Sequence, residues 1–162
     1  MTESEPVAPR VIKANKSLQF KIGTGPLDTK VVEKCQAVID NNDVDFTPLA
    51  MEYLGKLNEA IQRAKKRDIG KEQAVANMTA PVMELKANAA LFKYNLIGNL
   101  ANVMLSFLEG IKDIDDDAIA IVEAHHKTLT AIVMKKMKGD GGAFGQEMLA
   151  ELKSACRRYF AR

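Results

Sequence analysis

The sequence predicts an all-α protein whose helices pack as an antiparallel bundle. From about residue 29 onward, apolar residues recur at helical spacing, and glycine, proline and acidic clusters interrupt them at short intervals. No pair of alternating strands is recognisable. Helices joined by short loops pack antiparallel to their neighbours. With 162 residues, of which 47% are hydrophobic, the chain is long enough to bury one core.

Composition excludes several classes of function. A net charge of only +2, with 27% charged residues, argues against a nucleic-acid-binding protein. No segment reaches the roughly 18 apolar residues that a membrane-spanning helix needs, so no membrane insertion is expected. Cys35 and Cys156 lie far apart and no secretory signal precedes them. We therefore expect reduced thiols and a cytoplasmic location.

The N-terminal segment differs from the rest. Residues 1–10 are acidic and contain proline, and we expect them to be disordered. Residues 11–28 have mixed periodicity and several glycines, so we expect an extended arm rather than a helix. The predicted organisation is a disordered tail and extended arm over 1–28, followed by a single helical-bundle domain over 29–162.

Two helices are predicted before Gly70. The first covers 29–39, where valines, a cysteine and an isoleucine form a short apolar stripe. The second covers 47–67, with Thr47 as the expected N-cap and Pro48 at the first helical position.

Two more helices follow, over 71–92 and 95–110. Pro81 is expected either to kink the first of these or to restart it, and Asn95 can cap the second. A further helix begins in the acidic run after Asp113, where the helix dipole favours negative charge, and the last covers 143–159. The residues expected to share one core are Leu85, Phe92, Leu96, Leu100, Met104, Val122, Leu129 and Val133.

The two histidines are adjacent, which limits what they can do. His126 lies on the apolar stripe of its helix and is expected at the core or its boundary, whereas His125 is the one expected to reach solvent. Side chains of adjacent residues point about 100° apart on a helix, so the pair cannot share a metal as i, i+4 ligands do. Two histidines and two cysteines form no zinc-binding spacing. No metal site and no cofactor are predicted.

The stretch MELKANAALFKY, which begins at Met83, resembles the centre of a histidine-phosphotransfer (HPt) domain. In that family the central helix carries His-x-Leu-Lys-Gly, followed by an apolar residue and a second glycine. Leu85 and Lys86 match this pattern, whereas Met83 stands at the histidine, Ala87 at the first glycine and Lys93 at the second. The similarity extends to the following helix and to both flanks.

The resemblance implies a four-helix core with flanking helices. The family's histidine accepts a phosphoryl group from a receiver domain or a kinase, but methionine has no ring nitrogen to hold one. The expected function is therefore a non-catalytic HPt-like adaptor in bacterial two-component or phosphorelay signalling, without enzymatic activity at this site. Its partner would be a response-regulator receiver domain or a sensor kinase, bound through a surface made of Met83, Lys86, Ala87, Ala90 and Lys93.

Two alternatives remain open at the level of sequence. The chain could be an active phosphotransfer protein that uses a displaced histidine, His125 or His126, although neither has a lysine three residues later. It could also be a structural or oligomerisation bundle without a signalling role, because helices alone imply no function.

Overall fold

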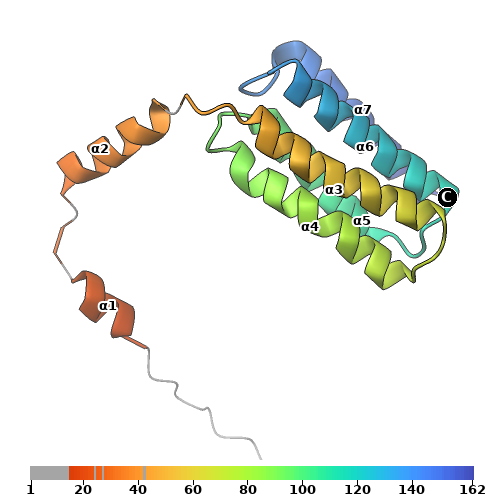
Figure 1. Cartoon of the computed structure of the whole chain (residues 1–162), viewed down its shortest axis with the longest axis horizontal. Coiled ribbons are helices and arrows are strands. Elements are labelled where there is room, and N and C mark those ends of the chain that lie inside the picture. Colours follow the sequence, from red (N-terminus) through yellow and green to blue (C-terminus); the bar gives the residue numbers. More distant parts are fainter. Residues whose placement is uncertain (1–14, 24, 27, 42) are drawn as a thin grey trace, which may run out of the picture. The chain divides into compact units, whose positions relative to one another are not determined.

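The structure, a computed structural model, describes residues 15–23, 25–26, 28–41 and 43–162. Every regular element within these ranges is helical, which confirms the predicted all-α class. None of the described helices combines the length and the apolar character needed to cross a membrane. The helices are α1 (Ser17–Ile22), α2 (Thr29–Asp40), α3 (Thr47–Lys65), α4 (Lys71–Ala89), α5 (Asn95–Gly110), α6 (Asp116–Met134) and α7 (Gly142–Phe160) (Figure 1).

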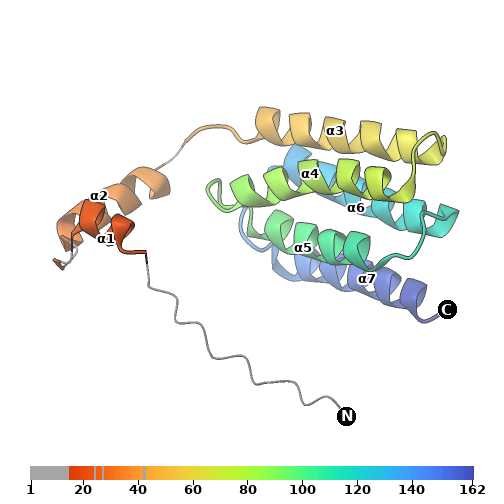
Figure 2. The same ribbon diagram turned by 90° about the horizontal axis from the view of Figure 1, so that it is seen from below.

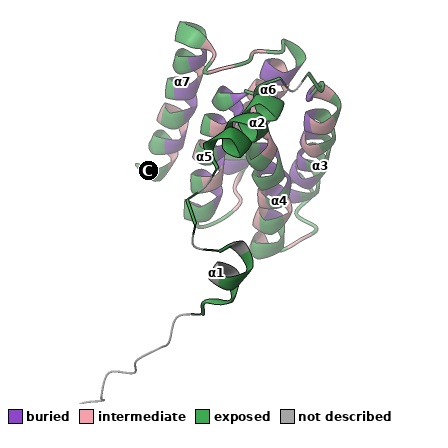
Figure 3. Ribbon diagram, turned by 90° about the vertical axis from the view of Figure 1, so that its left-hand side faces the viewer, coloured by how far each residue is buried: buried purple, intermediate pink, exposed green. Residues whose placement is uncertain are grey.

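The chain divides into two units, Met1–Asn41 and Asn42–Arg162. This division differs from the expected start of the bundle at residue 29. Helix α2 contributes no buried residue, and it is exposed along its whole length in Figure 3. The buried residues of the described chain begin only at Phe46.

Within the first unit, the expected extended arm over 11–28 is wrong for the residues of α1. The Asn15 side chain accepts a hydrogen bond from the backbone N–H of Ser17 at 2.9 Å, which starts this short helix. Helix α2 begins where predicted and ends at Asp40, one residue after the predicted end at 39. The Asp28 side chain caps its start by accepting a hydrogen bond from the N–H of Lys30. The expectation of disorder over 1–10 concerns residues outside the described ranges.

The second unit is the helical bundle. Helix α3 packs against α4 and α6, α4 packs against α5, and α7 packs against α5 and α6 (Figure 2). Successive helices are in contact and short loops join them, so neighbours run antiparallel as predicted. The predicted core is present: Leu85, Leu96, Leu100, Met104, Val122, Leu129 and Val133 are buried, and the partly buried Phe92 packs against them.

The α4–α5 turn and the α6–α7 loop are hydrogen-bonded to each other. The N–H of Gly139 donates to the carbonyl of Lys93 at 2.6 Å, and the N–H of Leu96 donates to the carbonyl of Gly139 at 2.9 Å. At the same end, the rings of Phe46 and Phe92 are stacked with their centroids 4.7 Å apart. This end of the bundle is therefore fixed by backbone and aromatic contacts together.

The start of α3 is capped differently from the expectation. Thr47 is the first helical residue rather than the N-cap, and its N–H donates to Asp45 Oδ1 at 2.9 Å. That hydrogen bond, together with the Lys136 ammonium 3.0 Å from Asp45 Oδ2, lowers the pKa of Asp45 to about 2. The Asp45 side chain, two residues before the helix, thus accepts the capping hydrogen bond that was expected of the Thr47 side chain.

Candidate functional site

Helix α4 turns a face of alanines and one methionine toward solvent, with the exposed Glu72 one turn before them in the first turn of the helix. Met78, Val82 and Leu85 lie on its buried face. Because successive residues of a helix are rotated by 100°, a second set of residues lies on the opposite face. All of that second set are exposed, and Met83 at its centre is 57% exposed. We call this set the outward α4 face: Ala76, Ala80, Met83, Ala87 and Ala90.

The two edges of the outward α4 face differ. On one edge, two hydrogen bonds hold the Asn88 side chain: its N–H₂ group donates to the backbone carbonyl of Glu84 at 2.9 Å and to the Tyr53 hydroxyl of α3 at 3.4 Å. On the other edge stands the exposed side chain of Lys86. The exposed carboxylate of Glu84 stands on the Asn88 edge, so a partner that covers the outward α4 face would meet a negative charge along one edge and a positive charge along the other.

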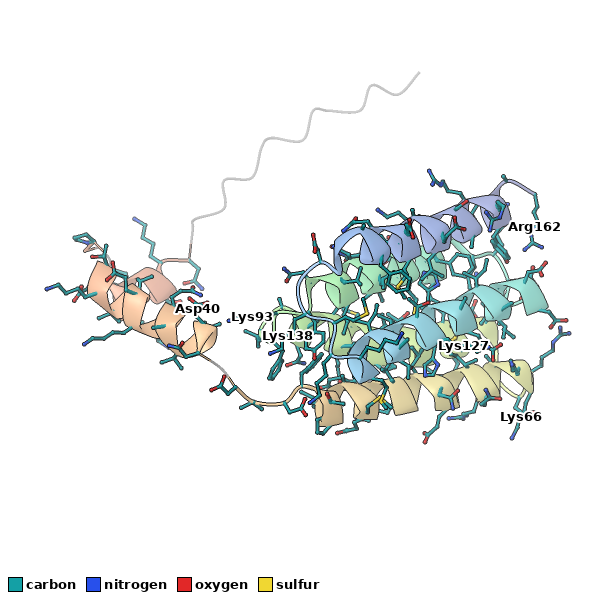
Figure 4. All side chains as sticks on the ribbon, turned by 90° about the horizontal axis from the view of Figure 1, so that it is seen from above. Asp40, Lys66, Lys93, Lys127, Lys138 and Arg162 are labelled. Carbon is teal, nitrogen blue, oxygen red and sulfur yellow. The ribbon has the colours of Figure 1, made fainter. Side chains whose placement is uncertain are left out.

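Lys93 lies beyond the helix, in the α4–α5 turn. Its backbone is left-handed, with φ of 63°, and its N–H donates to the Ala90 carbonyl at 3.1 Å. A residue with a Cβ costs about 1–2 kcal/mol in this conformation, whereas glycine adopts it readily. In Figure 4, Lys93 lies at the same end of the bundle as Lys138.

The structure thus brings together most of the predicted partner-binding residues. Met83, Ala87 and Ala90 share one face, Lys86 borders it, and Lys93 follows in the turn after the helix. The expectation that Met83 points away from the core is confirmed by its exposure.

His125 does not reach solvent, and the expectation that it would is wrong. It is 0% exposed, and its Nδ1 lies 2.9 Å from the Ile121 carbonyl. A carbonyl can only accept, so Nδ1 carries the proton and Nε2 is the bare nitrogen. Nε2 is buried without a hydrogen-bond partner among the described residues. Burial lowers the pKa of His125, which keeps the ring neutral at physiological pH.

His126 is half-buried between two helices. Its Nε2 donates to the Leu54 carbonyl of α3 at 3.1 Å, which links α6 to α3. Burial also lowers the pKa of His126. A histidine that accepts a phosphoryl group must present a ring nitrogen to an incoming domain. His125 presents neither nitrogen, and the Nε2 of His126 is already engaged.

The acidic side chains and the two cysteines are the other groups that could bind a metal ion or react as nucleophiles. Within the part of the chain that the structure describes, no three histidine, cysteine or acidic side chains converge in a way that could hold a metal ion. Burial raises the pKa of the Cys156 thiol to about 11, so it is not a thiolate at neutral pH. Cys35 is exposed on α2.

Comparisons of the chain with protein-family models, with curated proteins and with solved structures found no match.

Proposed function

We propose that the chain is a non-catalytic, HPt-like adaptor that binds a receiver domain or a kinase domain of a two-component system through the outward α4 face. The observation that carries the proposal is the 57% exposure of Met83, at the position where the resembled family has its phosphoacceptor histidine. A large apolar side chain is therefore exposed at the position where the resembled family binds its partners.

The chemistry of the face supports protein binding. Alanines on both sides of Met83 let a partner's backbone approach closely, and the flexible thioether adapts to an irregular surface. Full burial of a methionine contributes about 1.5–3 kcal/mol, so covering the exposed half of Met83 would contribute about 1 kcal/mol. The nearby Lys86 favours a partner with acidic groups at the matching edge.

The same residues support binding without phosphate transfer. Met83 has no ring nitrogen to accept a phosphoryl group, His125 is buried, and the Nε2 of His126 already donates to the Leu54 carbonyl. Lys93 places a long side chain where the family has a glycine, which narrows the approach to that end of the face. No observation favours transfer through His125 or His126.

Binding is tested with the purified full-length chain against the receiver and kinase domains of its own organism, by calorimetry. We expect at least one domain to bind, and Met83→Glu to weaken that binding by about tenfold or more, because it places a charge within a desolvated contact. Met134→Glu is the matched control, since Met134 is 62% exposed on α6, outside the outward α4 face. Absence of binding by every domain, or equal loss in both variants, would refute the proposal.

Phosphate transfer is tested separately. Incubation with a phosphorylated receiver should leave no acid-labile, base-stable phosphate on the chain. If label appears and is lost in His126→Ala, the chain is an active phosphotransfer protein instead.

A further inference from the structure

An open apolar groove of about 390 Å³ lies between α5 and α7 of the bundle. Val103 and Phe107 of α5 and Cys156 and Phe160 of α7 form its apolar lining. Pockets that bind small molecules are concave, mostly apolar and about 300–1,000 Å³ in volume. This feature, which we call the α5–α7 groove, therefore has the size and the lining of a small-molecule site.

Aromatic packing fixes the floor of the α5–α7 groove. The Phe107 ring lies 5.2 Å from the Tyr159 ring and 5.6 Å from the Phe160 ring, measured between centroids. Phe107 is 1% exposed, so the apolar lining still open to solvent belongs mainly to the partly exposed Val103 and to Phe160, which is 50% exposed. One of these two side chains comes from each helix, so a single alkyl chain lying between α5 and α7 would cover both.

Each rim of the α5–α7 groove carries two polar side chains that are one helical turn apart. Lys153 and Arg157 stand on the α7 rim, and Asn102 and Ser106 stand on the α5 rim. All four residues are exposed. In the described part of the chain, no acidic side chain pairs with either cation, and the side chains on the α5 rim make no hydrogen bond. These polar groups are therefore free to contact a ligand.

The two cations of the α7 rim leave a positive charge that nothing in the described chain neutralises. Like charges four residues apart on a helix repel each other, so Lys153 and Arg157 destabilise this side of α7. The nearby Arg162, by contrast, pairs with Asp117. An anion between Lys153 and Arg157 would remove the repulsion, and a guanidinium group matches the geometry of a carboxylate in particular.

Helices α5 and α7 run parallel, which gives the α5–α7 groove two distinct ends. A Cβ on Gly141, just before α7, would lie 2.6 Å from the side chain of Leu96 at the start of α5. A Cβ on Gly110, at the end of α5, would lie 2.9 Å from the ring of Phe160 at the end of α7. The two starts therefore lie together, and so do the two ends (Figure 2).

The charges at the two ends differ. Lys153 and Asn102 border the end nearer the helix starts, and Phe160 borders the other end, about 10 Å further along α7 at 1.5 Å per residue. The exposed Glu109 follows Asn102 by seven residues, so it lies on the same side of α5 but near the Phe160 end. An anionic head group is therefore favoured at the Lys153 end, with an apolar chain extending toward Phe160.

We infer that the α5–α7 groove binds a free medium-chain fatty acid. Its carboxylate lies between Lys153 and Arg157, and its alkyl chain lies between Val103 and Phe160. The buried floor is within reach of a single chain but not of a flat lipid surface, so the ligand is a free fatty acid rather than a bilayer. The site lies on α5 and α7, so the inference does not depend on the adaptor function of the outward α4 face.

A series of amphiphiles tests the chemistry of the site. Decanoate, below its micelle concentration, is titrated into the full-length chain in a calorimeter, and we expect it to bind with one molecule per chain. Hexanoate should bind more weakly, by up to about fourfold for each buried methylene that it lacks. Decyltrimethylammonium has the same chain with a cationic head group, and it should bind at least tenfold more weakly than decanoate because the α7 rim is positive.

A pair of variants tests the role of the α7 rim. Arg157→Glu should weaken decanoate binding by about tenfold, because losing an exposed ion pair costs up to about fivefold and the new acid adds repulsion. Arg158→Glu is the matched control, since Arg158 hydrogen-bonds to Ser154 and does not line the α5–α7 groove. It should leave the affinity for decanoate unchanged.

Amide chemical-shift mapping with decanoate locates the ligand. The largest shifts should fall on Val103, Cys156 and Arg157 and on the neighbouring turns of α5 and α7. Shifts confined to other helices would overturn the inference.

Four further results would overturn it. The first is a wild-type chain that does not bind decanoate. The second is equal binding of decanoate and decyltrimethylammonium, which would mean apolar adsorption only. The third is an equal loss of affinity in Arg157→Glu and Arg158→Glu. The fourth is sedimentation of the chain with vesicles of phosphatidylcholine and phosphatidylglycerol that Arg157→Glu abolishes, which would mean that the α7 rim binds a membrane surface.

Discussion

Truncating two residues on α4 to alanine, one at a time, should have very different effects on stability. Met83 and Leu85 are two positions apart, so their side chains point about 160° apart on the helix. Met83 is 57% exposed and Leu85 is 1% exposed. Comparing the two variants therefore tests whether the face of α4 on which the adaptor proposal depends is exposed to solvent.

The expected magnitudes follow from these exposures. Folding removes less than half of Met83 from water, and full burial of methionine contributes about 1.5–3 kcal/mol, so Met83→Ala forfeits about 1 kcal/mol or less. Alanine is also the better helix former by a few tenths of a kcal/mol, which offsets part of that loss. Leu85→Ala removes a fully buried side chain and leaves a cavity, which costs about 2–5 kcal/mol.

Urea unfolding followed by tyrosine fluorescence measures both variants. The chain has three tyrosines and no tryptophan, and Tyr53, Tyr94 and Tyr159 all lie in the bundle unit, so the signal reports on that unit alone. A lower midpoint at unchanged slope gives the loss in free energy of unfolding. A cost above about 2 kcal/mol for Met83→Ala, or below about 0.5 kcal/mol for Leu85→Ala, would mean that the inward and outward faces of α4 are wrongly assigned.

Three further predictions concern other parts of the bundle. Because burial lowers the pKa of His125, the unfolded chain takes up a proton near pH 6.5 that the folded chain refuses. The free energy of unfolding should therefore be largest above about pH 6.5 and fall as the pH drops below it, and His125→Gln should reduce that slope in urea titrations at several pH values. Gly145→Ala should cost about 1–3 kcal/mol in urea unfolding, because its Cβ would lie 2.6 Å from the Asp140 carbonyl oxygen; a neutral effect would mean that this contact relaxes freely. Met83→His should restore slow phosphate acceptance from a phosphorylated receiver, measured as acid-labile label, and Lys86→Ala in that background should weaken it; no label in either protein would count against the resemblance.

The sequence predicted the bundle well because its signals are local. Apolar spacing and glycine breaks placed α3 to α7 within a few residues of their observed bounds. The exposure of Met83 also followed from the sequence, because Met83 lies about 100° from Val82 on the helix and Val82 belongs to the apolar stripe.

The histidines show where local pattern fails. The stripe through Val122, Leu129 and Val133 suggested that His126 pointed inward and His125 outward. Helix α6 packs against α3, α5 and α7, so its buried face is wide and His125 falls inside it, with the buried Ala118 two turns before it and the buried Ile132 two turns after it. The number of helices that pack against α6 is a property of the tertiary structure. It cannot be predicted from the apolar periodicity of α6 alone.

The exposure of α2 and the exposure of Phe160 were missed for related reasons. The stripe on α2 reads as a core face in the sequence, yet α2 buries nothing within the chain's described residues. Phe160 continues the apolar pattern of α7 by one residue, but it is 50% exposed, and its ring lies 2.9 Å from where a Cβ on Gly110 of α5 would stand.

The central claim is that a signalling domain docks on the outward α4 face, and amide chemical-shift mapping tests it most directly. Isotope-labelled full-length chain is titrated with the receiver or kinase domain that binds it. The account predicts that the largest shifts fall on Met83, Lys86, Ala87 and Ala90 and at the α4–α5 turn. Shifts confined to α2, α5 or α7, with α4 unchanged, would contradict it.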